Sequence, residues 1–226
     1  MSETGSGTKV KDAYRYCREL VRAQDKDRFL TSLYAPAERR PFLIALYAFA
    51  LEIARVRRLV KEPMTGEVRL QWWLEAVRGL RAQEAAANPV MIALNDAARQ
   101  AGVALDPLTG AVEARQAELY GTPAVASASA VFMMAARLLG AEDEAIGAAA
   151  DQAAQAVTSL DEPRDAEQVT ASYTAFRARI PHLPEAALPA FLPVALVPLL
   201  LRRPQAPPWR RQLELVRTAW FGFPKL

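Results

Sequence analysis

Four charged residues that lie close together in the chain are the first candidates for chemistry. Glu52, Arg55, Arg57 and Arg58 follow a long apolar segment. Glu52 and either Arg55 or Arg58 have the spacing of an ion pair on a helix surface. Three interpretations of the arginines remain open. They form a solvated helix face, bind a diphosphate or an anionic lipid directly without a metal, or belong to a protein-binding surface.

Carboxylates are the second group of candidates, because clustered carboxylates hold Mg²⁺ in proteins. Five acidic residues could form such a cluster if they faced one cavity: Glu75, Glu113, Glu118, Asp151 and Glu162. Asp165 lies close to Glu162, but Pro163 interrupts any helix that would present the two together. We interpret this segment as a solvated, charged loop.

Single copies of cysteine and histidine exclude other kinds of site. Cys17 and His182 are alone in the chain, so a zinc site built from cysteine and histidine is excluded. A lone cysteine also forms no disulfide framework and suits a reducing cytosol. The net charge of +3, from 28 basic and 25 acidic side chains, is too small to argue for a nucleic-acid partner.

Composition and periodicity predict helices that position these charges. Alanine is abundant, and there are only 10 glycines among the 226 residues, which favours an all-α chain. A buried helix hairpin is predicted over residues 39–76. Its first helix begins at Pro41 and ends before Pro63. Apolar residues three and four apart give it one stripe: Phe42, Leu46, Phe49, Ile53, Val56 and Val60.

The second helix of the hairpin is predicted over Glu67–Gln83. Its buried face is predicted to hold Val68, Trp72, Ala76 and Leu80, widened by Trp73 and Val77, with both indoles in the core. Further helices are predicted over Lys11–Gln24, Val90–Ala101, Leu108–Tyr120, Pro123–Leu139 and Glu142–Leu160. Asn88-Pro89 begins the second of these and Gly102 closes it. The 16 prolines cluster late in the chain, so the C-terminal third should contain broken helices.

The hairpin also carries a family resemblance. Arg40-Pro41, Ala45-Leu46 and Tyr47-Ala48-Phe49 resemble the squalene/phytoene synthases, and looser matches cover nearly the whole chain. The resemblance implies a single-domain, all-α helical bundle of the isoprenoid (terpenoid) synthase type over residues 11–226. Residues 1–10 are polar and are expected to form a disordered tail.

The same resemblance places two acidic Mg²⁺-binding motifs. The aspartates of the first fall on Ala54, Arg55 and Arg58, and those of the second fall near Glu162 and Asp165. A guanidinium ~6 Å from a Mg²⁺ costs roughly 5 kcal/mol at an effective dielectric constant of about 20. We therefore expect no metal, no cofactor and no catalytic residues, and Mg²⁺ only if the chain is a divergent enzyme.

Two segments, Glu52 to Arg57 and Glu62 to Trp73, are similar to the branch of the family that includes the mitochondrial complex I assembly factor. This implies a pseudoenzyme that acts as an assembly or accessory factor with a protein partner. The alternatives are a divergent prenyltransferase of isoprenoid biosynthesis that condenses isoprenyl diphosphates, or a protein that binds prenyl chains or lipids. Seven residues are candidates for a cavity or a partner surface: Arg40, Tyr47, Glu52, Gln71, Trp72, Glu113 and Arg115.

The C-terminal segment mixes arginines with aromatic residues: Arg202, Arg203, Trp209, Arg210, Arg211, Trp220, Phe221 and Phe223. This mixture suits a membrane interface or a partner groove, and equally suits aromatic residues that close the bundle. The apolar run from Leu188 to Leu201 contains three prolines and is too short to span a bilayer. We expect a cytoplasmic protein, or one peripheral to the inner membrane.

Overall fold

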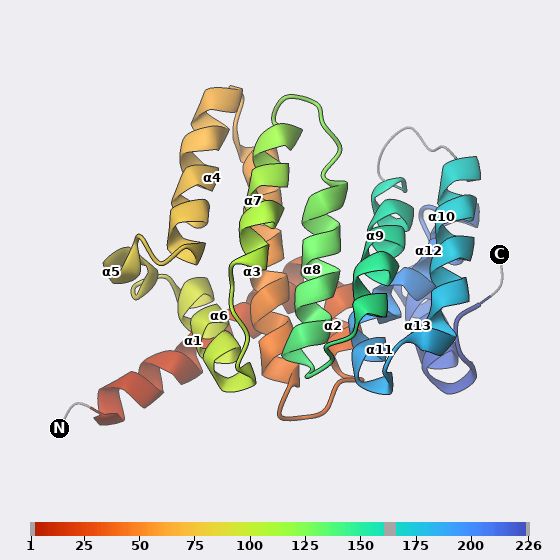
Figure 1. The fold of residues 1–226 in the computed structure, drawn as a ribbon, viewed down its shortest axis with the longest axis horizontal. Coiled ribbons are helices and arrows are strands. Elements are labelled where there is room, and N and C mark those ends of the chain that lie inside the picture. Colours follow the sequence, from red (N-terminus) through yellow and green to blue (C-terminus); the bar gives the residue numbers. More distant parts are fainter. Residues whose placement is uncertain (1–2, 161–165, 225–226) are drawn as a thin grey trace.

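The computed structural model describes residues 3–160 and 166–224, and every regular element within those ranges is helical. The prediction of an all-α chain is confirmed for this part of the molecule. The α-helices are α1 (Glu3–Gln24), α2 (Lys26–Ser32), α3 (Arg40–Leu59), α4 (Pro63–Val77), α5 (Ala82–Ala85), α6 (Pro89–Ala101), α7 (Pro107–Glu118), α8 (Val125–Leu138), α9 (Glu144–Thr158), α10 (Ala166–Arg179), α11 (Leu188–Phe191), α12 (Val197–Arg202) and α13 (Pro208–Phe221). Figure 1 shows them as one bundle, with α4 and α5 at one end and α10, α12 and α13 at the other.

Helix α3 is the centre of this bundle, as the sequence predicts. It contacts α1, α2, α4, α6, α7 and α8. Five of the six predicted stripe residues are buried, from Phe42 to Val56, and Val60 at the C-cap is partly buried. Pro41 lies in the first turn, where its missing N–H group leaves no hydrogen bond unmade. The predicted buried helix is confirmed here.

The buried face of α4 differs in part from the prediction. Trp73, Ala76 and Val77 are buried as predicted. Leu70 is buried as well, whereas Val68 and Leu80 are 70% and 72% exposed. Helix α4 is at the edge of the bundle and packs on α3, α5 and α7, so only one narrow stripe of it is covered. The helix also ends at Val77, which leaves Leu80 in the following turn rather than on a helical face.

The two signals that bound α6 are confirmed at its ends. The Asn88 side chain accepts hydrogen bonds from the backbone N–H groups of Val90 and Met91, at 2.9 and 3.1 Å. Such an N-cap satisfies donors that the first helical turn leaves free. Gly102 ends the helix with a φ of 71°, a left-handed conformation that glycine adopts without a Cβ penalty.

Helix α1 begins earlier than predicted. It starts at Glu3, whereas the sequence predicts a disordered tail over residues 1–10 and a helix from Lys11. Residues 7–9 of the helix are exposed, so this end is a solvated extension whose backbone hydrogen bonds are made within the helix. Farther along, Cys17 is fully buried, and burial raises the pKa of its thiol to about 12.

The C-terminal third is broken into short helices, as the prolines predict. Three 3₁₀ segments, η1 (Ile180–His182), η2 (Glu185–Ala187) and η3 (Leu192–Leu196), alternate with α11 and α12. Residues 185–202 have a mean hydropathy of 1.6, so by length and composition they match a membrane-spanning helix, but half of this window is buried within the bundle.

An aromatic cluster joins this third to the rest of the bundle. The ring of Phe191 stacks on Phe132 of α8, with centroids 5.6 Å apart, and lies 5.6 Å from Phe176 of α10. Phe223 packs edge-on against Phe176 at 5.4 Å. The Tyr173 hydroxyl donates a hydrogen bond of 2.9 Å to the carbonyl oxygen of Pro224, which fixes the segment after α13 against α10.

Candidate functional site

A cavity of about 930 Å³ lies at the C-terminal end of α3. Helices α2, α7, α8 and α9 and the η3–α12 segment provide its other walls. One part of the lining is apolar: Phe132, Val157, Leu196, Val197 and Leu200. Its volume lies near the upper end of the range typical of small-molecule sites, so it has room for an extended hydrocarbon chain.

Charged side chains line another part of the cavity, and most of them are paired. The Arg115 Nη1 donates to Glu118 Oε2 at 2.8 Å. Arg28 lies 3.5 Å from Asp25. Asp27 accepts a hydrogen bond of 2.7 Å from the α13 residue Arg211. Each of the three carboxylates in the lining, Asp25, Asp27 and Glu118, is therefore held by an arginine.

Arg57 and Arg58 are different. Both line the cavity and both are exposed. Neither makes an ion pair with any side chain in residues 3–160 or 166–224. Together they give the polar end of the cavity a local positive charge. That charge favours a ligand with an anionic group.

The three residues at the first family motif do not act together. Arg58 lines the cavity, whereas Arg55 donates a hydrogen bond of 2.8 Å to Glu52, which resolves the choice of ion-pair partner left open by the sequence. Ala54 is only partly buried and offers no ligand atom. One methyl group and two guanidinium groups do not fit a Mg²⁺ site, which needs oxygen ligands. Glu162 and Asp165, at the second motif, lie outside the described residues.

Other carboxylates do not rebuild a metal site within the described residues. Glu75 is bonded to Arg81, Glu113 to Arg78, Glu118 to Arg115 and Asp151 to Ser129. Across residues 3–160 and 166–224, no three histidine, cysteine, aspartate or glutamate side chains are grouped so that they could hold a metal ion. The fifth candidate, Glu162, lies in the segment that is not described.

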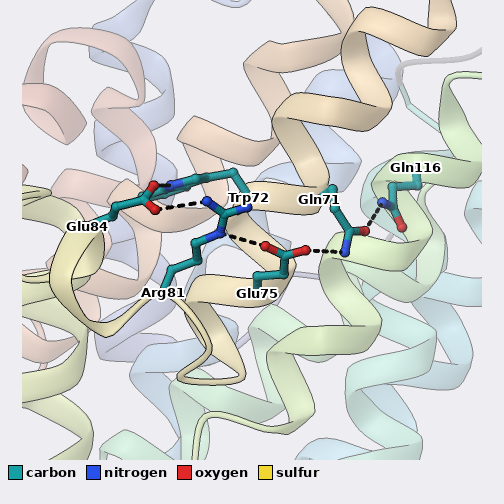
Figure 2. Close-up of polar contacts among 6 residues, drawn as sticks. All are labelled: Gln71, Trp72, Glu75, Arg81, Glu84 and Gln116. Atoms are coloured by element: carbon teal, nitrogen blue, oxygen red, sulfur yellow. Dashed lines mark hydrogen bonds and ion pairs between the residues drawn. The ribbon is translucent and has the colours of Figure 1, made fainter.

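Gln71 and Trp72 belong to a second site, a polar network at the α4 edge of the bundle (Figure 2). The Trp72 indole N–H donates to Glu84 at 2.7 Å, and Arg81 bonds both Glu84 and Glu75. Gln71 donates to Glu75 and accepts from Gln116 of α7. The network joins α4 to the turn before α5 and to α7. Trp73 is buried in the core as predicted, whereas Trp72 is only partly buried.

Of the remaining candidates, Tyr47 does not line the cavity but contacts Arg28, which does. Its side chain is buried, and its hydroxyl has no hydrogen-bond partner among the residues that the structure describes. Burial raises the pKa of that hydroxyl. The Arg28 guanidinium lies over the Tyr47 ring, 5.5 Å from its centroid, so Tyr47 helps to hold a cavity-lining arginine. Arg40 instead donates to the carbonyl oxygen of Ala35, and Glu113 is half-exposed at the surface. Neither lines the cavity.

The sequence singled out Arg57, Arg58 and Arg115 as candidates, but it did not single out Arg28. Arg28 comes from α2, far from α7 in the sequence, and only the packing of the bundle brings it to Arg115 and α3. The sequence signal was weak: a capping Asp25 three residues before Arg28, which indicates a helix start and not a cavity. Arg57 differs from Arg55 only in which side of α3 it occupies.

Glu52 offers a test of this arrangement through its pKa. Its side chain is only 12% exposed. Desolvation raises the pKa of its carboxyl above the ordinary value of 4.5, and Arg55 lowers it by a smaller amount. A raised pKa means that the charged form lowers the stability of the fold at neutral pH. This cost disappears as the pH falls below the pKa of the unfolded chain.

We therefore expect Glu52→Gln to raise the free energy of unfolding at pH 7, with a gain that shrinks to nothing near pH 4. Urea unfolding at several pH values measures it. Glu19→Gln, at an exposed position on α1, is the control. A loss of stability at pH 7 would show that the bond to Arg55 outweighs desolvation, contrary to this expectation.

The chain is similar to known proteins in sequence. The family model of squalene/phytoene synthases matches residues 21–165. The protein named NADH dehydrogenase (ubiquinone) complex I, assembly factor 6 from Bos taurus is 38% identical over 96 residues, 42% of this chain and 29% of the relative. Its Homo sapiens counterpart is 35% identical over 104 residues, 46% of this chain and 31% of the relative. The chain thus matches less than a third of the length of these relatives.

A solved structure extends the similarity to the whole fold. A dehydrosqualene synthase in complex with a ligand matches 95% of this chain and 97% of its own, with a TM-score of 0.70 and 12% sequence identity. The predicted all-α bundle of the isoprenoid synthase type is thereby confirmed. At this identity the likeness concerns the fold alone.

Proposed function

The chain belongs to the squalene/phytoene synthase family, and from that membership we propose that it is a non-catalytic member that acts as an assembly or accessory factor for respiratory complex I. Two kinds of support converge. The matched relatives carry the name complex I assembly factor 6. The observation that carries the proposal is that Arg57 and Arg58 line the cavity and make no ion pair within the described ranges, residues 3–160 and 166–224.

Prenyl transfer begins with the departure of a charged leaving group, a diphosphate. Ionisation of an allylic diphosphate needs Mg²⁺ ions that take up the charge of the departing diphosphate, and carboxylates hold such ions. Here Arg58 and Arg57 stand on the cavity wall, and Ala54 brings no oxygen ligand. These residues repel a divalent cation. The proposed role is protein contact at complex I, in the cytoplasm or at the inner membrane.

Deleting the gene from its own organism tests the role. We expect less assembled complex I on native gels and lower NADH-dependent quinone reduction, both restored by the wild-type gene. The purified protein, incubated with farnesyl diphosphate and Mg²⁺, should release no pyrophosphate above a no-enzyme blank, with an authentic synthase as the positive control. Normal complex I in the deletion strain, or pyrophosphate release, would refute the proposal.

A second candidate function has its own observation in favour. The cavity combines an apolar wall with two guanidinium groups that have no ion-pair partner in the part of the chain that the structure describes. This combination suits an amphiphile with a hydrocarbon chain and an anionic head. Arginines bind phosphate groups directly through charge-assisted hydrogen bonds. The chain would then hold a prenyl or lipid ligand without a metal. Such binding is compatible with an accessory role.

A further inference from the structure

Helix α13 presents an apolar line to solvent. Trp209, Leu213, Val216 and Trp220 follow each other at steps of four, three and four residues, so they lie along one side of the helix. Their exposed fractions are 58%, 61%, 44% and 80%. Phe221, 85% exposed, lies beside the end of this line. Large apolar side chains exposed together in this way indicate a contact surface.

The opposite side of α13 holds the helix firmly in place. Leu215 is buried in a small cluster with Leu192 and Leu196 of η3. Arg211 bonds both Asp27 of α2 and the carbonyl oxygen of Ala206. The exposed line is therefore the outer side of an anchored helix. Figure 1 shows α13 with α12 at the end of the bundle away from α4.

Arginines border the apolar line. Arg202 and Arg203, at the end of α12, line a hollow of about 660 Å³ together with Arg217 and Phe221. Arg210 lies 5.0 Å from the ring centroid of Trp209. Glu214 lines the same hollow and lies 4.0 Å from Arg217. Among the described residues, four guanidinium groups thus lie beside the apolar line against the one carboxylate of Glu214.

We propose that this α13 surface, formed by the exposed residues of α13 with Arg202 and Arg203, docks on an anionic lipid bilayer. A helix that lies in the plane of a bilayer buries one apolar line in the interface, while its basic side chains meet anionic headgroups. Tryptophan is enriched at that depth. Trp209 and Trp220 lie roughly 16 Å apart along the axis, so both reach the same plane. This surface lies outside the central cavity.

Vesicle binding by the full chain tests this proposal. We expect the protein to co-sediment with vesicles of phosphatidylcholine and phosphatidylglycerol in a 70:30 ratio. Binding to phosphatidylcholine alone should be at least tenfold weaker. Leu213→Ser with Trp220→Ser should lower binding to the anionic vesicles at least tenfold. The matched control is Val68→Ser with Leu80→Ser, two equally exposed apolar residues at the α4 end, which should leave binding unchanged.

A second pair of variants tests the charges separately. Each arginine near an anionic surface strengthens binding about fivefold, so Arg202→Gln with Arg203→Gln should weaken binding about 25-fold. Salt at 0.5 M should reduce wild-type binding similarly. Lys11→Gln with Arg18→Gln removes the same charge from exposed positions on α1 and should have a small effect. Circular dichroism verifies that each variant is folded.

Three results would overturn the proposal. One is a wild-type protein that does not bind anionic vesicles. Another is an equal loss of binding in the α4-end control. The third is a wild-type dimer that Leu213→Ser with Trp220→Ser converts to a monomer without any vesicle binding, because this would assign the α13 surface to a second copy of the chain.

Discussion

Replacing both Arg57 and Arg58 with glutamine is expected to weaken the binding of geranylgeranyl diphosphate to the central cavity about 100-fold. In the wild-type protein, the diphosphate should raise the melting temperature in the presence of a chelator, because a ligand that binds only the folded state stabilises it. Each charge-assisted hydrogen bond contributes about 1.5–3 kcal/mol. Losing two of them costs at least about 3 kcal/mol, and because solvent screens these exposed side chains, we expect slightly less, the roughly 2.8 kcal/mol that corresponds to 100-fold. Calorimetric titration at several ionic strengths measures it.

Arg55→Gln is the matched control, since Arg55 is on the same helix but bonds Glu52 and does not line the cavity. It should leave the affinity within twofold of wild type. An equal loss in this control would mean that the general charge of α3 matters and not the cavity. Binding that requires Mg²⁺ and vanishes with chelator would instead favour the divergent prenyltransferase.

Phe191→Ala is expected to lower the free energy of unfolding by about 3–5 kcal/mol, the usual cost of truncating a buried phenylalanine. Phe191 is fully buried between Phe132 of α8 and Phe176 of α10. Its ring therefore connects the C-terminal short helices to the central bundle. The substitution removes both ring contacts and leaves a cavity that the flanking rings cannot fill. Denaturant unfolding followed by circular dichroism gives the change.

Phe221→Ala provides the comparison, because the same side chain is removed from a position that is 85% exposed. This variant should change stability by less than about 0.5 kcal/mol. A similar loss in both variants, or a loss below about 1 kcal/mol for Phe191→Ala, would show that the aromatic cluster does not couple the two parts of the chain.

Local signals in the sequence predicted the elements that are determined locally. Asn88 and Gly102 bound α6 because their caps depend on neighbouring backbone groups. The α3 stripe was readable because residues 42–50 of that helix are all buried, so an apolar residue there is correctly placed on whichever side it lies. The family resemblance, carried by Tyr47-Ala48-Phe49, also gave the fold class.

Features that depend on tertiary packing were predicted less well. Apolar residues lie on more than one side of α4, and the sequence placed Val68 and Leu80 on the buried face but not Leu70. Only the position of α4 at the edge of the bundle decides between them. At the C-terminus, Phe223 turns into the core while Trp220 faces solvent. The alternative in which aromatic residues close the bundle therefore holds for Phe223, whereas a membrane or partner contact of Trp220 stays a prediction.

The buried thiol of Cys17 can report on how often the N-terminal part of the core opens. A maleimide reagent reacts with thiolate, and this sulfur is neither accessible nor ionised while α1 rests on α3 and α6. Since the chain has one cysteine, every labelled molecule records a single event, the parting of the N-terminal helix from its neighbours. The labelling rate thus measures how often the contacts of α1 with α3 and α6 are broken, without any engineered probe.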